Sequence, residues 1–173
     1  MAVSNSGEVC TVRAASDSAG ACIAMMVSDS AGSCLVMAEF NSTRECIEMM
    51  VSDGAGASIE MMVSDTAAAC IAVADCAKAC TAMAVSDSGE VCTVRAESDS
   101  AGTCIAMAVS DSGEVCTVKA ASDSAGACIA MAVFDSDGLC RVKAASDTGA
   151  ACIAVVVGDC AKWQCPTVVK CAL

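Results

Sequence analysis

Hydrophobic and polar residues alternate along most of this chain in short segments that recur every twelve residues. Segments such as CTVRA at 10–14 and CIAMAV at 128–133 alternate with period two, and a Ser-Asp-rich stretch such as SDSAG or SDTG follows each. Such alternation is typical of a β-strand with one buried face, whereas Ser, Asp and Gly favour turns. The pattern therefore predicts one strand and one turn in each unit.

Helices are the alternative that this composition raises, because Ala and Met are good helix formers. Twelve residues are not a multiple of the about 3.6 residues in a helical turn, and a Ser-Asp stretch interrupts every unit. We therefore expect an all-β chain.

Cysteine marks the repeat. The cysteines are twelve residues apart over most of the chain, except between Cys70 and Cys80, where the spacing is ten, and Ser58 takes the place of one cysteine. Two kinds of unit alternate in the second half, VCTVKAASDS and ACIAMAVSDS, so the full period is 24 residues. Identical strands stacked about 4.8 Å apart form a solenoid. The expected fold is a β-solenoid with 24-residue coils of two strand-turn units, a flat two-sheet prism with a small Cys/Ala/Val interior.

A longer repeat divides the chain in two. ACIAVADCAKAC at 69–80 corresponds to ACIAVVVGDCAKWQC at 151–165. We expect a first repeat block at 1–82 and a second block at 83–173 that ends in a C-terminal cap, within one continuous solenoid. Because seven units, an odd number, separate VCTVRA at 9–14 from its copy, the copy should begin on the opposite sheet.

The interior should be narrow if the cysteines point inward. Facing cysteines would then approach the Cα separation of a disulfide, about 5.5–6 Å. One consistent set of bonds joins successive cysteines, namely Cys10–Cys22, Cys34–Cys46, Cys80–Cys92, Cys104–Cys116 and Cys128–Cys140.

The outward positions predict one apolar surface. If strands alternate strictly between two sheets, one sheet carries an outward row rich in Ile and a second row rich in Met, and an exposed apolar face of this kind marks an interaction site. The candidate surface-binding residues are Ile59, Thr81, Thr103, Ile105, Ile129, Ile153, Met61, Met83, Met107 and Met131. The opposite sheet changes midway, from Ile23 and Met25 to Thr93/Arg95, Thr117/Lys119 and Arg141/Lys143.

Two glutamates conflict with this arrangement. Glu48 and Glu60 each lie two residues after the cysteine position, where the side chain should point inward. Burying two carboxylates is costly. One alternative is that the alternation of inward and outward side chains shifts locally. The other is that these strands are reversed, with Ile and Met pointing inward and Cys outward.

Charge and cysteine content restrict the partners and the compartment. The net charge of −12 argues against binding to nucleic acid or to anionic membranes. No apolar run reaches the about 18 residues that span a bilayer, and MAVSNSGEVC lacks the basic and apolar regions of a signal peptide. Sixteen cysteines and no histidine favour disulfides over metal. Disulfides would imply a secreted or extracellular protein.

Catalytic chemistry is not indicated by any motif. The chain has no histidine for a Ser-His-Asp or Cys-His nucleophile and no glycine-rich phosphate loop. We expect no enzyme activity, no catalytic residues, no cofactor and no metal. The recurring turn Asp, as in Asp65 and Asp87, is expected to cap its own turn, and a Ca²⁺ ladder along this column is the alternative.

Three kinds of segment resemble the disulfide-containing β-solenoid antifreeze proteins of insects: VCTV at 9–12, 91–94 and 115–118, GTC at 102–104 and ACT at 79–81. In that family an inward Cys lies between outward Thr residues, and regular outward rows bind ice. This chain has one cysteine per twelve residues where the family has two, and Ile usually replaces Thr. The resemblance implies ice as the partner.

We therefore expect a non-catalytic repeat protein that binds ice or another regular surface through one flat sheet face. The alternative is a structural solenoid that self-assembles into a dimer or filament through its apolar Ile/Met face.

Overall fold

The computed structural model describes residues 2–4, 10–16, 19–28, 33–52, 57–76, 78–99, 102–123, 127–134, 139–146, 151–158 and 167–171. All regular structure in these residues is β-strand, as the alternating pattern predicted. The strands are β1 (Ala2–Ser4), β2 (Cys10–Ser16), β3 (Ala19–Ser28), β4 (Cys34–Ser52), β5 (Ala57–Cys76), β6 (Ala79–Ser98), β7 (Thr103–Ser122), β8 (Ala127–Phe134), β9 (Leu139–Ser146), β10 (Cys152–Val157) and β11 (Thr167–Cys171).

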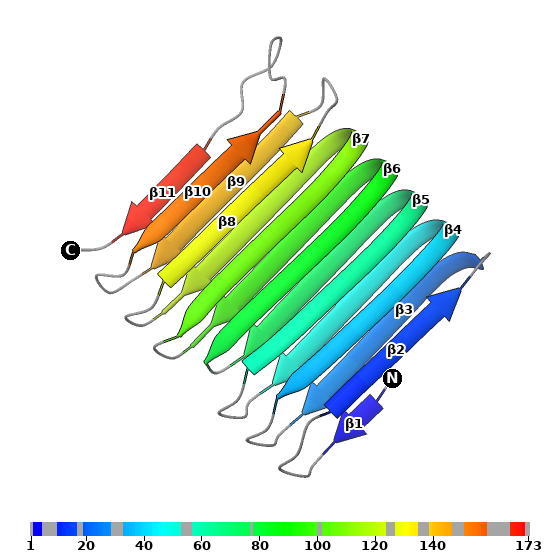
Figure 1. Ribbon diagram of the computed structural model, residues 1–173, viewed down its shortest axis with the longest axis horizontal. Coiled ribbons are helices and arrows are strands. Elements are labelled where there is room, and N and C mark those ends of the chain that lie inside the picture. Colours follow the sequence, from blue (N-terminus) through cyan, green and yellow to red (C-terminus); the bar gives the residue numbers. More distant parts are fainter. Residues whose placement is uncertain are drawn as a thin grey trace.

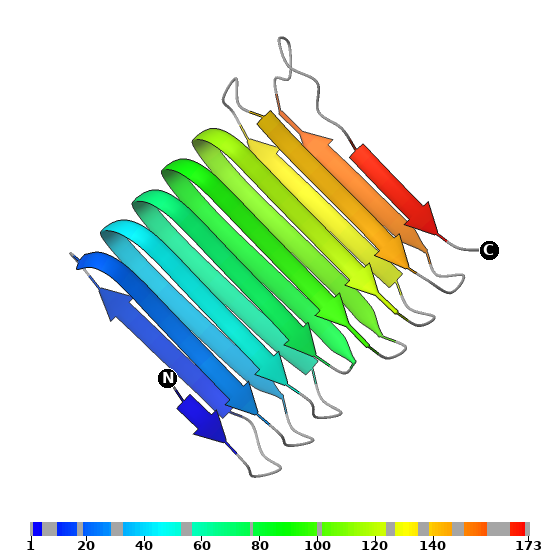
Figure 2. The ribbon, with the colours of Figure 1, turned by 180° about the vertical axis from the view of Figure 1, so that it is seen from behind.

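The strands form two parallel sheets that face each other, which confirms the β-solenoid. Sheet one contains β2, the first parts of β4 to β7, β8 and β10; sheet two contains β1, β3, the second parts of β4 to β7, β9 and β11. The long strands β4 to β7 pass from one sheet to the other through a curved segment, which we call the arch edge (Figure 1). On the opposite side, the loop edge, connections lead into the next coil (Figure 2).

Successive coils are in register, so each position of the repeat stacks on itself. In sheet one the cysteine column runs Cys10, Cys34, Ser58, Cys80, Cys104, Cys128, Cys152. In sheet two it runs Cys22, Cys46, Cys70, Cys92, Cys116, Cys140. The predicted strict alternation between the sheets is therefore confirmed, including the change of sheet for the second copy of VCTVRA.

The ten-residue spacing between Cys70 and Cys80 does not disturb this register. Only residues 77 and 78 separate β5 from β6, whereas residues 53–56 separate β4 from β5. The two missing residues come from the loop edge, so no strand position is lost. β6 pairs along its length with β5 and β7, and the ladder runs through residues 82 and 83 without interruption.

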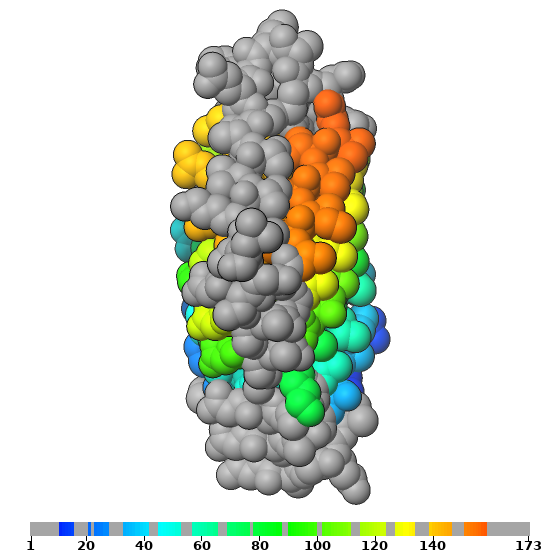
Figure 3. Space-filling view, turned by 90° about the vertical axis from the view of Figure 1, so that its left-hand side faces the viewer, coloured from blue at the N-terminus to red at the C-terminus, as the bar shows by residue number. Residues whose placement is uncertain are grey.

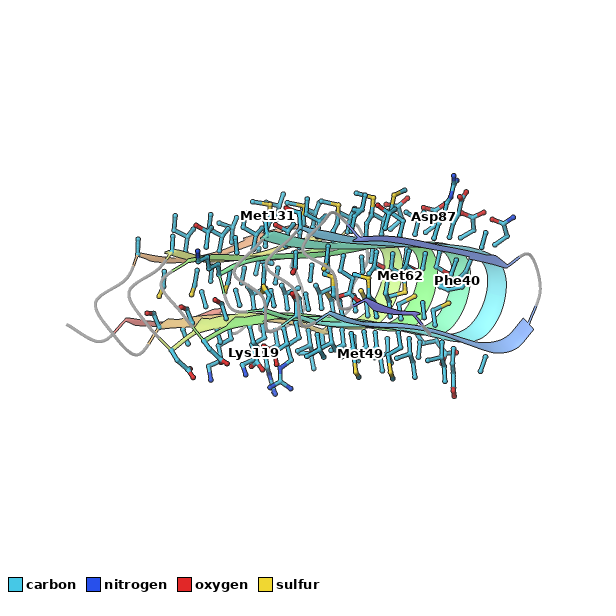
Figure 4. The ribbon with its side chains drawn as sticks, turned by 90° about the horizontal axis from the view of Figure 1, so that it is seen from below. Phe40, Met49, Met62, Asp87, Lys119 and Met131 are labelled. Carbon is cyan, nitrogen blue, oxygen red and sulfur yellow. A yellow bond between two sulfur atoms is a disulfide. The ribbon has the colours of Figure 1, made fainter. Side chains whose placement is uncertain are left out.

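The interior is as small as predicted from Cys80 onward. The fully buried side chains there include Cys80, Ala82, Val94, Ala96, Cys104, Ala106, Ala108, Val118, Ala120, Ala130, Ala132, Val142 and Ala144. The earlier coils also bury large side chains, namely Met26, Phe40, Met50 and Met62. Figure 4 shows Phe40 and Met62 between the two sheets, whereas Met49, Lys119 and Met131 point away from them.

Candidate functional site

The outer side of sheet one carries three rows of side chains that run along the solenoid. The first row is Thr11, Leu35, Ile59, Thr81, Ile105, Ile129, Ile153. The second row is Arg13, Met37, Met61, Met83, Met107, Met131, Val155. The third row is Ala15, Glu39, Val63, Val85, Val109, Val133, Val157. Figure 3 shows side chains of β10 and β8 next to one another on one flank of the molecule.

Charge is confined to one end of these rows. Arg13 and Glu39 form an ion pair of 3.7 Å between exposed side chains. From Ile59 to Val157 the three rows contain only Ile, Met, Val and Thr81. We call this part the sheet-one face. Most of its side chains are half-buried, because in-register neighbours cover one another, and the most exposed are Ile59 at 43%, Ile153 at 50% and Val157 at 52%.

All ten residues predicted for surface binding lie on this side of sheet one. Nine of them, together with Val155, form the first two rows of the sheet-one face. The tenth, Thr103, is exposed at the start of β7, at the loop edge. The third row was not among the predicted surface-binding residues, although the alternation places its valines, such as Val133, on the outer side as well.

Sheet two changes from apolar to basic along its outer side, as predicted. Ile23 and Ile47 give way to Thr93 and Thr117, and the next row changes from Met and Val to Arg95, Lys119 and Lys143. Glu97 pairs with Arg95 at 2.7 Å and also with Lys119. Burial alone would raise the pKa of Glu97, but hydrogen bonds and charge from Lys119 and Arg95 lower it below its ordinary value, so this carboxylate is ionised.

Glu48 and Glu60 point into the interior, so the alternation neither slips nor inverts. Both side chains are fully buried. Glu48 stacks between alanines of sheet two, and Glu60 lies in sheet one. Of their four carboxyl oxygens, only Oε1 of Glu60 accepts a hydrogen bond, from the backbone N–H of Val73 at 3.2 Å.

Burial keeps these two carboxyl groups protonated at neutral pH. It raises the pKa of Glu48 from 4.5 to about 8, and burial together with the nearby Glu48 carboxyl raises the pKa of Glu60 to about 9. A neutral acid is far cheaper to bury than a carboxylate. Because both groups are closed off from solvent, the pair is part of the core and has no open side on which to receive a ligand. Within the described residues, no group of three or more His, Cys, Asp or Glu side chains could hold a metal ion.

The structure contains one disulfide in its described part, and it is not one of the expected bonds. Cys80 bonds Cys76, with a Cα–Cα distance of 6.0 Å, so the Cys80–Cys92 bond is wrong. The expected bonds Cys34–Cys46, Cys104–Cys116 and Cys128–Cys140 are wrong as well, because all six residues are thiols. The pair Cys10–Cys22 lies outside the described side chains.

Geometry explains why cysteines twelve residues apart do not bond. Consecutive units run in opposite directions across the prism, so a cysteine that begins a strand of sheet one lies at the loop edge. The next cysteine begins a strand of sheet two and lies at the arch edge. A strand of six residues separates them by about 20 Å, far beyond the reach of a disulfide.

The thiols of sheet one have another role at the loop edge. Cys104 and Cys128 each donate a hydrogen bond across the interior to a backbone carbonyl of sheet two, seventeen residues later, with Sγ–O distances of 3.1 and 3.2 Å. The acceptors are Ala121 and Ala145. The Cys80 sulfur lies in the equivalent place, 2.8 Å from the carbonyl oxygen of Glu97, but it is bonded to Cys76 and has no proton to donate. This repeated bond ties the two sheets together once in each of these coils.

Comparison with protein-family models, with curated proteins and with solved structures found no match for this chain. The register and the stacked coils define the class of protein, a β-solenoid repeat protein. In the part of the chain that the structure describes, no helix is long and apolar enough to cross a bilayer.

Proposed function

We propose that this protein is a non-catalytic solenoid that binds ice, an extended ordered surface, through the sheet-one face. The observation that carries the proposal is the register of three uncharged rows over the coils that begin at Ser58, Cys80, Cys104, Cys128 and Cys152. These rows repeat a fixed set of side chains once per coil. Equally spaced side chains can make the same contact repeatedly with a surface that is itself ordered.

Rigidity supports this function. The backbone under the rows is held by parallel ladders on both sides, and the interior behind it is closely filled by Cys and Ala. A face that is already ordered loses little conformational entropy on binding. Thr81 and Thr103 add hydroxyls to an otherwise apolar surface, as the resemblance to insect antifreeze proteins implies.

The second candidate is self-assembly, favoured by the Ile and Met side chains where Thr would suit ice better. Five coils about 4.8 Å apart and three rows about 6.6 Å apart give a footprint of about 500 Å². Two copies that bury this face against each other would cover about 1,000 Å², which is the lower end for a specific interface. Large exposed apolar patches usually have such a partner.

An oxidising compartment is part of the proposal. The Cys76–Cys80 bond supports it, because disulfides persist mainly in secreted and extracellular proteins. Absence of catalysis is proposed on the sequence, which lacks histidine and known catalytic motifs.

One pair of variants tests the choice of face. Ile129→Lys places a charge in the middle of the sheet-one face, and Ile71→Lys places the same charge after a cysteine of sheet two. Thermal hysteresis and sedimentation velocity are measured on the purified proteins. Ice binding predicts hysteresis in the wild-type monomer, lost in Ile129→Lys and kept in Ile71→Lys.

The same measurements separate the two candidates. A wild-type dimer without hysteresis, dissociated by Ile129→Lys, supports self-assembly instead of ice binding. If Ile71→Lys has effects equal to those of Ile129→Lys, sheet one is the wrong face for either function. Circular dichroism of both variants checks that the solenoid is intact.

A further inference from the structure

The outer side of sheet two carries a compact set of cations in its last coils, which we call the basic face: Arg95, Lys119, Arg141 and Lys143. Arg95, Lys119 and Lys143 stack in one row, each in register with the next. Arg141 stands in the neighbouring row, behind Thr93 and Thr117. Four of the nine basic residues of the chain therefore lie on three consecutive strands of one sheet.

Like charges in register repel each other and destabilise a sheet. Glu97 relieves part of this repulsion, because its carboxylate pairs with both Arg95 and Lys119. No ion pair of Arg141 or Lys143 occurs within the described residues, and Arg141 is exposed. The basic face thus keeps a net charge of about +3 in a chain whose net charge is −12.

Acidic residues border the basic face along the loop edge, where Asp99 and Asp123 are exposed. Asp65, Asp87 and Asp111 are exposed along the arch edge. Figure 4 shows Lys119 pointing outward from sheet two and Asp87 on the other side of the molecule, toward the arches. A polyanion that crosses the face to the loop edge meets the carboxylates of Asp99 and Asp123. One that runs along the solenoid axis meets the cations in turn, and the neighbouring Glu97 carboxylate is already paired with Arg95 and Lys119.

We propose that the basic face binds a single chain of an acidic polysaccharide, laid along the solenoid axis. Such a chain carries a carboxylate or sulfate on successive sugars, and a sugar ring is about as long as the spacing between two coils. Successive anions can therefore meet Arg95, Lys119 and Lys143 in turn, with charge-assisted hydrogen bonds. The hydroxyls of Thr93 and Thr117, half-buried beside the cations, face the sugar hydroxyls.

The width and the charge of the site disfavour duplex nucleic acid. A duplex is broader than this row and carries a dense double line of phosphates, which the acidic edges and the overall negative charge repel. The basic face also has no aromatic side chain on which a base could stack. A thin chain with one charge per sugar avoids both difficulties.

The test measures binding of defined polymers by isothermal titration calorimetry over a series of salt concentrations. Polygalacturonate supplies carboxylates, dextran sulfate supplies sulfates, a DNA duplex supplies phosphates, and neutral dextran is the uncharged control. The variants are Lys143→Gln and the double variant Arg141→Gln/Lys143→Gln. Lys78→Gln is the matched control, because Lys78 is exposed at the loop edge, away from the basic face, and its loss changes the net charge equally.

The wild type and Lys78→Gln are expected to bind one or both acidic polymers and not dextran. Each cation removed from the basic face should weaken binding about tenfold and reduce the slope of log affinity against log salt by about one. The stronger of the two acidic polymers identifies the anionic group.

Three results overturn the proposal: no binding of either acidic polymer at low salt, an equal loss of affinity in Lys78→Gln, or tighter binding of a DNA duplex than of both polysaccharides. The proposal is independent of ice binding and of self-assembly. Variants of Ile129 leave the basic face untouched and should bind the polymer normally.

Discussion

The carboxyl group of Glu60 accepts a hydrogen bond through Oε1 from the backbone N–H of Val73 at 3.2 Å, and this is the only hydrogen bond that the four carboxyl oxygens of Glu48 and Glu60 make. Glu48 makes none with its carboxyl oxygens. The interior therefore holds two acids that are stable there only in their protonated form.

This arrangement predicts stability that falls as the pH rises. The folded-state pKa values of Glu48 and Glu60, about 8 and about 9, lie above the ordinary value of 4.5. The contribution of the two protonated carboxyl groups to the free energy of unfolding is therefore complete below pH 4.5, and it decreases as the pH rises from 4.5 to about 9. Each carboxyl should contribute a loss of about 1.4 kcal/mol per pH unit in this window. Urea unfolding at pH 5, 7 and 9 measures it. The double variant Glu48→Gln/Glu60→Gln should lack this slope, and a wild type with equal stability at pH 5 and 9 would contradict the burial of the pair.

The position of the Cys76–Cys80 bond predicts where a second disulfide can be added. Ser98 is in register with Cys76, and Cys104 is in register with Cys80. The Ser98 hydroxyl also lies within hydrogen-bond reach of the Cys104 thiol. In Ser98→Cys we expect the introduced thiol to bond Cys104 under oxidising conditions, seen by peptide mapping, with a gain of about 2 kcal/mol over the reduced form. Ser98→Ala is the control, and an introduced thiol that remains reduced would show that the two columns are too far apart there.

Gly102 is predicted to tolerate no side chain. A Cβ at this position would overlap the backbone carbonyl of Lys78, which the short connection before β6 brings close to the next loop. Gly102→Ala should lower the free energy of unfolding by about 1–3 kcal/mol or more, measured by thermal or urea unfolding. Its neighbour Thr103 is exposed, so Thr103→Ala should change stability by no more than about 0.5 kcal/mol. Equal stability of the two variants would refute the close approach.

The core thiols should be unreactive in the folded protein. Burial raises the pKa values of Cys70 and Cys104 to about 11, and the thiolate is the reactive species. At pH 8 we expect iodoacetamide to modify both residues only after unfolding, whereas Cys152, which is less buried, reacts earlier. Mass spectrometry of timed samples measures this order. Labelling of Cys104 as fast as Cys152 in the native protein would contradict it.

Register and faces could be predicted because they depend only on parity and spacing. A constant twelve-residue interval fixes which side chains stack, and the inward Cys fixes which point out, so Ile129 and Met131 could be placed on one face with Ile59 and Met61. The third row, which contains Val109, follows from the same parity.

The disulfides and the interior could not be predicted in this way. Whether Cys80 meets Cys76 or Cys92 depends on which edge of the prism each occupies, and a cysteine spacing alone does not contain that information. The burial of Glu48 and Glu60 was also open, because a carboxyl that keeps its proton can occupy a position from which a carboxylate is excluded. The large residues Phe40 and Met62 are buried in the earlier coils, where the inward positions do not follow the Cys/Ala pattern of the later coils.

The short connection after Cys76 also bears on how such a chain can change length during evolution. The connection there is two residues shorter than the twelve-residue interval would give, and neither face is altered, because the number of strands is the same. Gain or loss of 24 residues likewise only lengthens or shortens the solenoid. Gain or loss of twelve residues moves every later strand to the other sheet. Lysines then take the place of methionines on sheet one, and methionines take the place of lysines on sheet two. A single half-unit event is thus enough to exchange the two surfaces of all the following coils.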